Sequence, residues 1–432
     1  MRRMQNVKGT FDYWGTEQAV RKKVQDTLAR LFVLYDYGAM ETPVLNEQSL
    51  LASKYAGGDE ILKEMYQLRD QGNRSLALRY DLTIPFAKVT AMYPGLELPF
   101  KRYEIGKVFR DGPVKRGRLR EFIQCDADAV GIAGPEAEAE LMQLAVDAFR
   151  ALDIGIVIRW NNRRFLGELL SRIGVTEDMQ LSVMLTLDKW AKIGAAGVEN
   201  ELLEKGIPTA VSAAVMELLQ RETASCSDLA AMYGMPDSPG TREVRALQSL
   251  IDQTGLGPWC VFDPFLSRGL SFYTGTVYEI FDSTGTFSSS LGGGGRYDSI
   301  IGKLVGRDDI LYPAVGLSFG IESIMELLKE RGLAVTEDAV VVVPIGNAAE
   351  ASLLAAAKLR QAGIRTRIDW SGRKLKKSLA AASAKGTRFV LLIGEEEAAA
   401  GIVRLKDMAQ ATERDMSAAE AAALIQAARQ SE

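Results

Sequence analysis

The stretch that decides the fold is PFKRYEIGKVFRDGPVKRGRLREFIQCDADAVG, residues 99–131. It contains two runs in which polar and apolar residues alternate, and between them a loop, residues 111–117, that carries Lys115 and Arg116. Alternation with a period of two is typical of β-strands that are buried on one face only. The sequence therefore predicts two antiparallel strands joined by a basic loop.

The second of these runs predicts a strand with one unusual face. A period of two places five side chains on that face, namely Arg120, Phe122, Gln124, Asp126 and Asp128. This set is poorly suited to a hydrophobic core. It is well suited to a ligand, since Arg binds phosphate, Phe stacks on a base, and Gln and Asp accept hydrogen bonds from an ammonium or N–H group. A solvated sheet face held by salt bridges is the alternative interpretation of this stretch alone.

The composition is that of a globular protein, and the length of 432 residues suggests two or three domains. No apolar run approaches the ~18 residues of a membrane span, and the start MRRMQNVKGT lacks the apolar core of a signal peptide. We therefore expect a cytoplasmic protein. The cysteines, Cys125, Cys226 and Cys260, form no CxxC pair, so neither structural zinc nor a disulfide framework is expected. A net charge of −4 argues against a nonspecific nucleic-acid coat but allows local basic patches.

Histidine is absent from the whole chain. No side chain therefore has an unperturbed pKa near neutrality, which excludes histidine as a general base, Ser-His triads and His-ligated metals. Any chemistry must depend on the positioning of substrates and on fixed charges.

The spacing of apolar and breaker residues predicts the order of the elements. They are a helix at 16–36, an extended stretch at 40–45, antiparallel strands within 75–131, a helix at 135–152, a mostly helical inserted module at 163–250, strands within 261–281, and a strand that turns into a helix at 312–331. A second unit begins near residue 336, with strands at 339–346, 364–369, 388–394 and 402–407 and helices between the first three of them. The first of these strands is a continuous β-branched run and is expected to be buried on both faces. The expected fold is α+β, with a small α/β unit at the end whose sheet is mainly parallel.

Two further stretches place reactive side chains beside expected strands. In RYDLT, residues 79–83, a strand would put Asp81 and Thr83 on one face, where a carboxylate and a hydroxyl could bind an ammonium group. In SRGLSFYTGTVYE, residues 267–279, two glycines leave room for a ligand against the strand, and Arg268 supplies a cation.

Two glycine-containing stretches have competing interpretations. GGGGRYD, residues 292–298, matches no phosphate-binding motif, so we expect a tight turn beside a ligand or another backbone. GRKLKK, residues 372–377, opens a helix with four cations, a position that suits phosphate contacts, although a solvated helix face would look the same.

Together these segments resemble the histidyl-tRNA synthetases, a family of class II aminoacyl-tRNA synthetases, over nearly the whole chain. The resembling segments are VKGT at 7–10 (an N-terminal signature), ETP at 41–43 (motif 1, at the dimer interface), 101–128 (motif 2), RGLSFY at 268–273 and GGRYD at 294–298 (the two histidine signatures), 313–322 (motif 3), and SGRKLKK with LIGEEE in the C-terminal unit (the anticodon-binding domain). Motif 2 followed in order by both histidine signatures is a specific match.

The resemblance implies the architecture and the activity. Residues 1–330 would form a class II catalytic domain, an antiparallel sheet flanked by helices with a helical insertion at about 163–250, and residues 336–432 an α/β anticodon-binding domain. The implied activity is ATP-dependent ligation of L-histidine to tRNA(His) through a histidyl-adenylate. The implied partners are ATP, L-histidine, tRNA(His) and a second copy of the chain, with Mg²⁺ bound together with ATP and no dedicated protein metal site.

It also implies roles for individual residues. Arg110 and Arg268 would be catalytic and would contact both substrates, Arg118 would hold the outer phosphates, and Phe122 would stack on adenine. Histidine would be bound by Asp81, Thr83 and Gln124 at its α-ammonium group, by Asp128 and Tyr273 at its imidazole nitrogens, and by Phe272 as a wall. The basic residues implied for tRNA are Lys115, Arg116, Arg373, Lys374, Lys376 and Lys377.

The chain departs from the family pattern at four positions. The signature's usual Asp and first Tyr are Ser271 and Phe272, the arginine that ends motif 3 is Ser323, and the usual motif 2 acid is Gly112.

Two other functions remain to be weighed. One is a catalytically silent, histidine-binding relative that regulates another enzyme, as the synthetase-like regulatory subunit of ATP phosphoribosyltransferase does. Such relatives typically lack the C-terminal domain and tend to lose the motif 2 arginines, whereas both are present here. The other is a synthetase for a different class IIa amino acid, whose pocket would lack the pair Asp128 and Tyr273.

Overall fold

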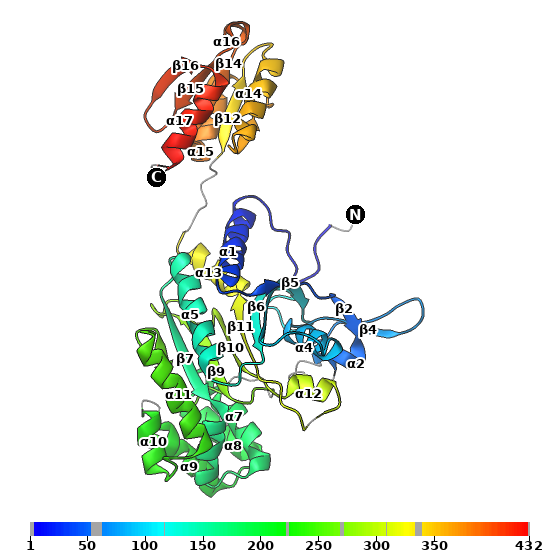
Figure 1. The fold of residues 1–432 in the computed structure, drawn as a ribbon, viewed down its shortest axis with the longest axis vertical. Coiled ribbons are helices and arrows are strands. Elements are labelled where there is room, and N and C mark those ends of the chain that lie inside the picture. Colours follow the sequence, from blue (N-terminus) through cyan, green and yellow to red (C-terminus); the bar gives the residue numbers. More distant parts are fainter. Residues whose placement is uncertain are drawn as a thin grey trace. The chain divides into compact units, whose positions relative to one another are not determined.

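The structure is a computed structural model that describes residues 4–52, 63–115, 117–221, 224–267, 272–307, 309–332 and 339–430. Arg116, Arg268 and Ser271 lie outside these ranges. The chain divides into two compact units, Met1–Leu333 and Ala334–Glu432, and each is described by itself (Figure 1).

The first unit is built on a large sheet whose strand order is β1-β5-β6-β11-β10-β9-β7-β8. The strands are β1 (Gly38–Ala39), β5 (Phe100–Phe109), β6 (Glu121–Val130), β11 (Ala314–Gly320), β10 (Gly292–Arg296), β9 (Thr276–Asp282), β7 (Ile156–Asn162) and β8 (Cys260–Phe262). All pairings from β5 to β7 are antiparallel, and only the outermost pairs, β1 with β5 and β7 with β8, are parallel. The expected antiparallel hairpin of residues 99–131 is confirmed as β5 and β6.

Three long helices cover one face of this sheet: α1 (Gly15–Leu34), α5 (Glu136–Ala151) and α13 (Ile321–Glu330) (Figure 1). Phe32 of α1 and Phe149 of α5 both pack against Phe319 of β11, with ring centroids 5.9 and 5.7 Å away. All three helices were expected from the apolar spacing, and so was the direct passage from β11 into α13. Because these helices seal one face, any ligand must approach the other.

The opposite face carries smaller elements: α4 (Thr83–Met92), α12 (Ile300–Leu304), and a three-stranded sheet of β2 (Leu45–Glu47), β4 (Ser75–Leu78) and β3 (Gln67–Arg69), with α2 (Gln48–Leu51) beside it. The prediction that residues 75–131 form only strands was wrong, because α4 lies within them. Its sequence, TIPFAKVTAM, is a short apolar run, and such runs do not distinguish helix from strand by their period. Pro85 falls in the first helical turn, where proline is tolerated.

Strand β10 corrects a second prediction. The glycines 292–295 do not form a turn but a strand in the middle of the sheet, paired with β9 on one side and β11 on the other. Glycine is required because the neighbours approach closely: a Cβ on Gly294 would stand 1.8 Å from the Gly316 carbonyl oxygen, and one on Gly295 3.0 Å from the Tyr273 ring. Four glycines in a row therefore leave this part of the sheet without side chains.

Between β7 and β8 the described residues are helical. The helices are α6 (Arg163–Arg172), α7 (Glu177–Leu187), α8 (Trp190–Glu204), α9 (Thr209–Leu219), α10 (Cys226–Met232) and α11 (Pro239–Gln253). They gather at one end of the first unit, with α11 in contact with α5 and β7 (Figure 1). None of the described helices in either unit is both long and apolar enough to cross a membrane.

The second unit has a five-stranded sheet in the order β13-β12-β14-β15-β16. The strands are β12 (Val340–Pro344), β13 (Thr366–Ile368), β14 (Phe389–Ile393), β15 (Val403–Asp407) and β16 (Thr412–Met416), and the helices are α14 (Ala349–Gln361), α15 (Leu375–Ala384), α16 (Glu395–Ala400) and α17 (Ala418–Gln430). The β-branched strand is buried on both faces, as predicted. The sheet is mixed rather than mainly parallel, since β14, β15 and β16 pair antiparallel.

Candidate active site

A small cavity lies on the face of the large sheet that is opposite to helices α1, α5 and α13. Its floor comes from β6, β10 and β11 and its rim from Thr83 and three aromatic residues; the lining side chains and glycines are Thr83, Asp126, Asp128, Phe272, Tyr273, Gly293, Gly294, Gly295, Tyr297, Gly316, Leu317 and Ser318. Its volume is about 30 Å³, and it is open on one side.

The floor consists of two rows of residues that run across the strands. In one row, Asp128 of β6 lies opposite Gly316 of β11, which lies opposite Gly295 of β10. In the next row, Asp126 lies opposite Ser318, which lies opposite Gly293. Residues paired in register point to the same face of a sheet, so both carboxylates stand beside bare glycine backbone.

Asp128 is bound on both of its carboxylate oxygens. Its Oδ1 accepts a hydrogen bond of 2.5 Å from the Tyr297 hydroxyl, and its Oδ2 lies 2.7 Å from Nη2 of Arg102. A Cβ on Gly316 would stand only 2.0 Å from Oδ1, so glycine is needed at that position. Burial raises the pKa of Asp128, and Arg102 and the Tyr297 hydroxyl act in the opposite direction.

Asp126 is buried beside it but is less completely bound. Burial, and then the neighbouring Asp128, raise the pKa of Asp126 to about 7, while Arg102 and a hydrogen bond from Ser318 lower it. Its Oδ1 is buried and has no hydrogen-bond partner within the described residues. The cavity thus holds two adjacent carboxylates, which favour a ligand that brings N–H donors or positive charge.

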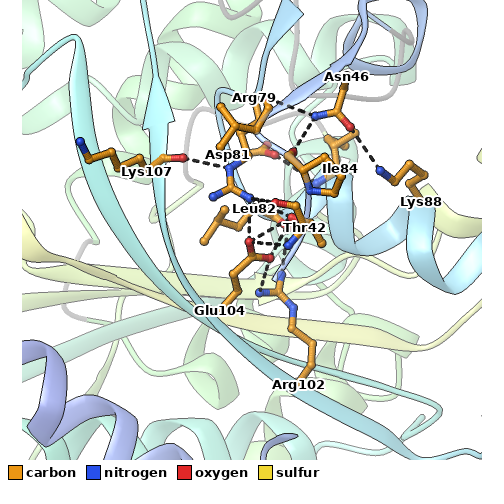
Figure 2. Close-up of polar contacts among 12 residues, drawn as sticks. Thr42, Asn46, Arg79, Asp81, Leu82, Ile84, Lys88, Arg102, Glu104 and Lys107 are labelled. Carbon is orange, nitrogen blue, oxygen red and sulfur yellow. Dashed lines mark hydrogen bonds and ion pairs between the residues drawn. The ribbon is translucent and has the colours of Figure 1, made fainter. Parts of the chain in front are cut away.

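A buried polar network holds the edge of this floor (Figure 2). Arg79 donates to Oε1 of Glu104 at 2.7 Å and to the backbone carbonyl oxygen of Thr42 at 2.6 Å, and the backbone N–H and the hydroxyl of Thr42 both donate to Glu104. Arg102 donates to the backbone carbonyl oxygen of Leu82 at 2.9 Å, and its Nη1 lies 4.0 Å from Oε2 of Glu104. Since Arg102 also pairs with Asp128, the network fixes the orientation of the pocket carboxylate.

The sequence predicted that Asp81 and Thr83 lie along a strand. They lie instead at the start of α4. Asp81 accepts a hydrogen bond from the backbone N–H of Ile84 at 3.1 Å, so it caps the first turn of the helix. Burial raises the pKa of Asp81 to about 6, against the lowering effects of that N–H and of Arg110. Thr83 lines the cavity. The two residues are therefore brought to one place by a helix N-terminus.

The other end of the site is cationic. The half-buried Arg110 follows β5, donates through Nε to the backbone carbonyl oxygen of Tyr80 at 3.0 Å, and lies over the ring of Phe122 with its Cζ 5.1 Å from the centroid. Burial lowers the pKa of Arg110, and Asp81 opposes this effect. Arg118, in the exposed loop, pairs with Glu64 at 2.5 Å. A cationic and aromatic end next to a carboxylate end is an arrangement that can bind a nucleotide beside an amino acid.

Glu64 lies next to Gly112, the position where the family usually has the motif 2 acid. A Cβ on Gly112 would stand 2.7 Å from Oε1 of Glu64, so the carboxylate of Glu64 occupies the space beside Gly112. An acid therefore reaches this place from another segment. Ser323, another departure, follows Glu322, which forms a buried two-point ion pair with Arg21 of α1 at 2.7 and 2.9 Å.

Three aromatic side chains form the rim of the cavity. The Phe272 ring lies 4.6 Å from that of Tyr273 and 6.2 Å from that of Tyr297, the latter edge to face. The sequence placed Asp126 on the ligand-binding face of this strand without a role of its own and assigned no role to Tyr297 or Ser318, although all three line the cavity. Signals existed, because Tyr297 belongs to the GGRYD stretch and Asp126 shares a strand face with Gln124 and Asp128. The hydroxyl of Ser318 could be placed only once the β6–β11 register was known.

Most of the predicted substrate-binding residues gather here: Asp81, Thr83, Gln124, Asp128, Phe272 and Tyr273 lie in or beside the cavity, and Arg110, Arg118 and Phe122 at its cationic end. Arg268 lies outside the described residues. Of the residues predicted for tRNA, Lys115 is exposed in the β5–β6 loop, and Arg116 is not described.

The other predicted tRNA residues belong to the second unit. Arg373 and Lys374 line a cavity of about 430 Å³ next to the carboxyl ends of β12 and β13, together with Trp370, whose side chain is 56% exposed. Lys376 and Lys377 are exposed on α15 just beyond it. Crevices at the carboxyl ends of parallel strands are common ligand sites.

Comparison with known proteins agrees with this geometry over nearly the whole chain. Residues 9–324 match the family model of histidyl-tRNA synthetase, and residues 339–428 match the anticodon binding domain. Histidine–tRNA ligase 1 of Bacillus cereus is 44% identical over 412 residues, which cover 95% of this chain and 97% of the relative.

Two solved structures are also similar. The histidyl-tRNA synthetase from Nostoc sp. PCC 7120 superposes with a TM-score of 0.83 at 27% identity, and the match covers 99% of both chains. A protein from Bacillus halodurans, described as an ATP phosphoribosyltransferase regulatory subunit/histidyl-tRNA synthetase, superposes with a TM-score of 0.72 over 90% of this chain and 98% of that one, but at 20% identity it is informative about the fold only.

The antiparallel sheet with its helices on one face and a ligand site on the other is the fold of the class II aminoacyl-tRNA synthetases, as the sequence predicted. Within that class, this chain belongs to the histidyl-tRNA synthetase family.

Proposed function

We propose that the chain ligates L-histidine to tRNA(His) in two steps, through a histidyl-adenylate. The observation that carries this proposal is the juxtaposition of a cavity lined by Asp128, Tyr273 and Tyr297 with the guanidinium of Arg110, which interacts electrostatically with Asp81 and Asp126. A neutral imidazole has one donor and one acceptor nitrogen, so a carboxylate and a phenol can recognise it together.

The chemistry suits a protein without histidine. The substrate carboxylate is already a nucleophile at neutral pH, and it attacks the α-phosphorus of ATP while pyrophosphate leaves, so no side chain has to act as a base. Arg110 would align the two reacting groups and stabilise the charge that develops on the α-phosphate. We assign Arg118 to the outer phosphates, Phe122 to adenine, and Asp81, Thr83 and Gln124 to the α-ammonium group. Arg268 keeps its catalytic assignment from the family resemblance.

Mg²⁺ is expected to enter with ATP. Glu64 fits this ion, since its carboxylate lies beside Gly112 and pairs with Arg118, and Mg²⁺ is usually held by one or two carboxylates together with substrate phosphates. When bound, the ion neutralises phosphate charge. We also propose a cytoplasmic homodimer, because residues 41–43 resemble motif 1.

Histidine-dependent ATP–pyrophosphate exchange tests the adenylation step. We expect exchange with histidine and Mg-ATP and none with other class IIa amino acids. Histidine binding without exchange would instead support the function of a silent regulatory relative. The Bacillus halodurans structure, whose name includes such a subunit, resembles this chain in fold alone. Exchange driven by a different amino acid would contradict the pocket assignment.

The cavity of the second unit is proposed to contact tRNA. The triple variant R373A/K374A/K377A removes three exposed cations and is expected to raise the KM for tRNA in aminoacylation by ~10-fold or more, with a weaker salt dependence, because phosphate contacts release counterions. ATP–pyrophosphate exchange should not change. The matched control, K358A/R360A/K385A, removes three exposed cations from the far ends of α14 and α15 and should leave both assays unchanged. An equal effect of both triples would mean that only net charge matters.

A further inference from the structure

Three buried acceptor atoms on β6 have no hydrogen-bond donor within the described residues: Oε1 of Gln124, Oδ1 of Asp126 and Oδ2 of Asp128. Leaving a buried acceptor unpaired is costly, so such atoms usually have a ligand or a water to bind. Asp128, the residue that the family resemblance assigns to the imidazole, differs in one respect. Its Oδ1 accepts from the Tyr297 hydroxyl, and its Oδ2, although without a hydrogen bond, has an ion-pair partner in Arg102 at 2.7 Å.

Ser318 joins Gln124 and Asp126. Gln124 donates through Nε2 to the Ser318 Oγ at 3.3 Å, and the Ser318 hydroxyl in turn hydrogen bonds to Asp126. Because the Ser318 oxygen accepts from Nε2 of Gln124, its own hydrogen is left to donate to Asp126. With Nε2 directed toward Ser318, Oε1 is the free end of the Gln124 amide. One acceptor is therefore left over at each end of the relay.

The positions of Gln124 and Asp126 match the α-ammonium group and the side chain of a bound histidine. Gln124, Asp126 and Asp128 follow one another on one strand face at intervals of about 7 Å, and Asp126 stands between the other two. Gln124 is the residue assigned to the α-ammonium group, so a ring bound farther along the strand presents its nearer nitrogen, Nδ1, toward Asp126.

We propose that Asp126 is a further specificity-determining residue for histidine, whose Oδ1 accepts a hydrogen bond from the Nδ1–H of the bound imidazole. Ser318 is the positioning residue that orients it. Nε2 is then the acceptor nitrogen and faces Tyr273, whose phenol hydroxyl can donate to it, while Asp128 keeps its contacts with Tyr297 and Arg102. This inference rests on the proposed function, because it assumes that histidine occupies the cavity.

The test measures Kd by calorimetry for histidine, Nδ1-methylhistidine and Nε2-methylhistidine, and KM in exchange. D126A should weaken histidine binding by about 10- to 100-fold, the range of a hydrogen bond to a charged group, with the KM for ATP within about twofold of wild type. Because a methyl group at Nδ1 replaces the hydrogen that Asp126 would accept, the preference for histidine over Nδ1-methylhistidine should fall at least ~10-fold in D126A, whereas the preference over Nε2-methylhistidine should change less than ~3-fold.

Two further variants and a control sharpen the result. D126N keeps the shape of the side chain but loses its charge, and it should weaken histidine binding less than D126A does. If D126A does not fold, D126N provides the test of the inference. S318A should weaken histidine binding by ~3- to 10-fold, because Asp126 loses its orienting donor. E121Q makes the same carboxylate-to-amide change on the exposed start of β6 and should bind histidine as the wild type does.

Unchanged histidine affinity in D126A and D126N would overturn the inference, and so would an equal loss for all three ligands, which would indicate a structural role. Both results are distinct from failure of the proposed function, in which the wild type itself gives no histidine-dependent exchange.

Discussion

Replacing Arg110 by alanine is expected to lower kcat for histidine-dependent exchange by about 100- to 1,000-fold. The Arg110 guanidinium is held in place by its hydrogen bond of 3.0 Å to the Tyr80 carbonyl oxygen, and its Cζ lies 5.1 Å from the centroid of the Phe122 ring. Its interaction with the α-phosphate grows as charge develops in the transition state, so its loss should affect kcat more than the KM for histidine.

The control for this variant is R150A. Arg150 is an exposed arginine on α5 that pairs with Asp147, and its removal should leave exchange within about twofold of wild type. R110K keeps a cation but not the planar fork, and should recover only part of the activity. If R110A and R150A had the same kcat, the assignment of Arg110 to the reacting phosphate would be wrong.

Replacing Glu104 by glutamine is expected to reduce the free energy of unfolding by about 3–5 kcal/mol, the cost of removing one partner from a buried ion pair. Glu104 is 1% exposed and accepts from Arg79 and Thr42, so the neutral amide leaves the buried Arg79 without its counter-charge (Figure 2). Urea denaturation would measure the change. Because Arg102 lies between Glu104 and Asp128, the KM for histidine should also rise.

The matched control is again E121Q, since Glu121 forms an exposed pair with Lys107 on the same two strands. Exposed pairs contribute about 0–1 kcal/mol, so this variant should unfold close to wild type. Equal stability of E104Q and E121Q would show that the network of Figure 2 has no special weight.

Much of the fold could be predicted because local patterns determine it. The alternation in residues 99–131 gave the β5–β6 hairpin, and the apolar spacing of α1, α5 and α13 gave the helices behind it. The polar face of β6 pointed to the site for the same reason, since a period of two sorts side chains by face. Helix α4 and strand β10 were misread, because a short apolar run has no distinct period and glycines usually mark turns.

The rest of the site depends on contacts between distant segments. Glu64 reaches the space beside Gly112, Ser318 lies opposite Asp126, and Tyr297 binds Asp128, across sequence separations that no local pattern encodes. The roles of the individual site residues remain predictions until the variants above are measured.

The alternation along β6 has a consequence for how this enzyme can fail. Gln124, Asp126 and Asp128 face the cavity, while Cys125, Ala127 and Ala129 between them are buried toward the helices. A slip of one residue against β5 or β11 would exchange the two sets, and would place carboxylates in an apolar core and small apolar side chains in the pocket. A molecule with a misaligned β6 would therefore be inactive rather than partly active. The specific activity of a preparation should then be proportional to its fraction of correctly paired molecules.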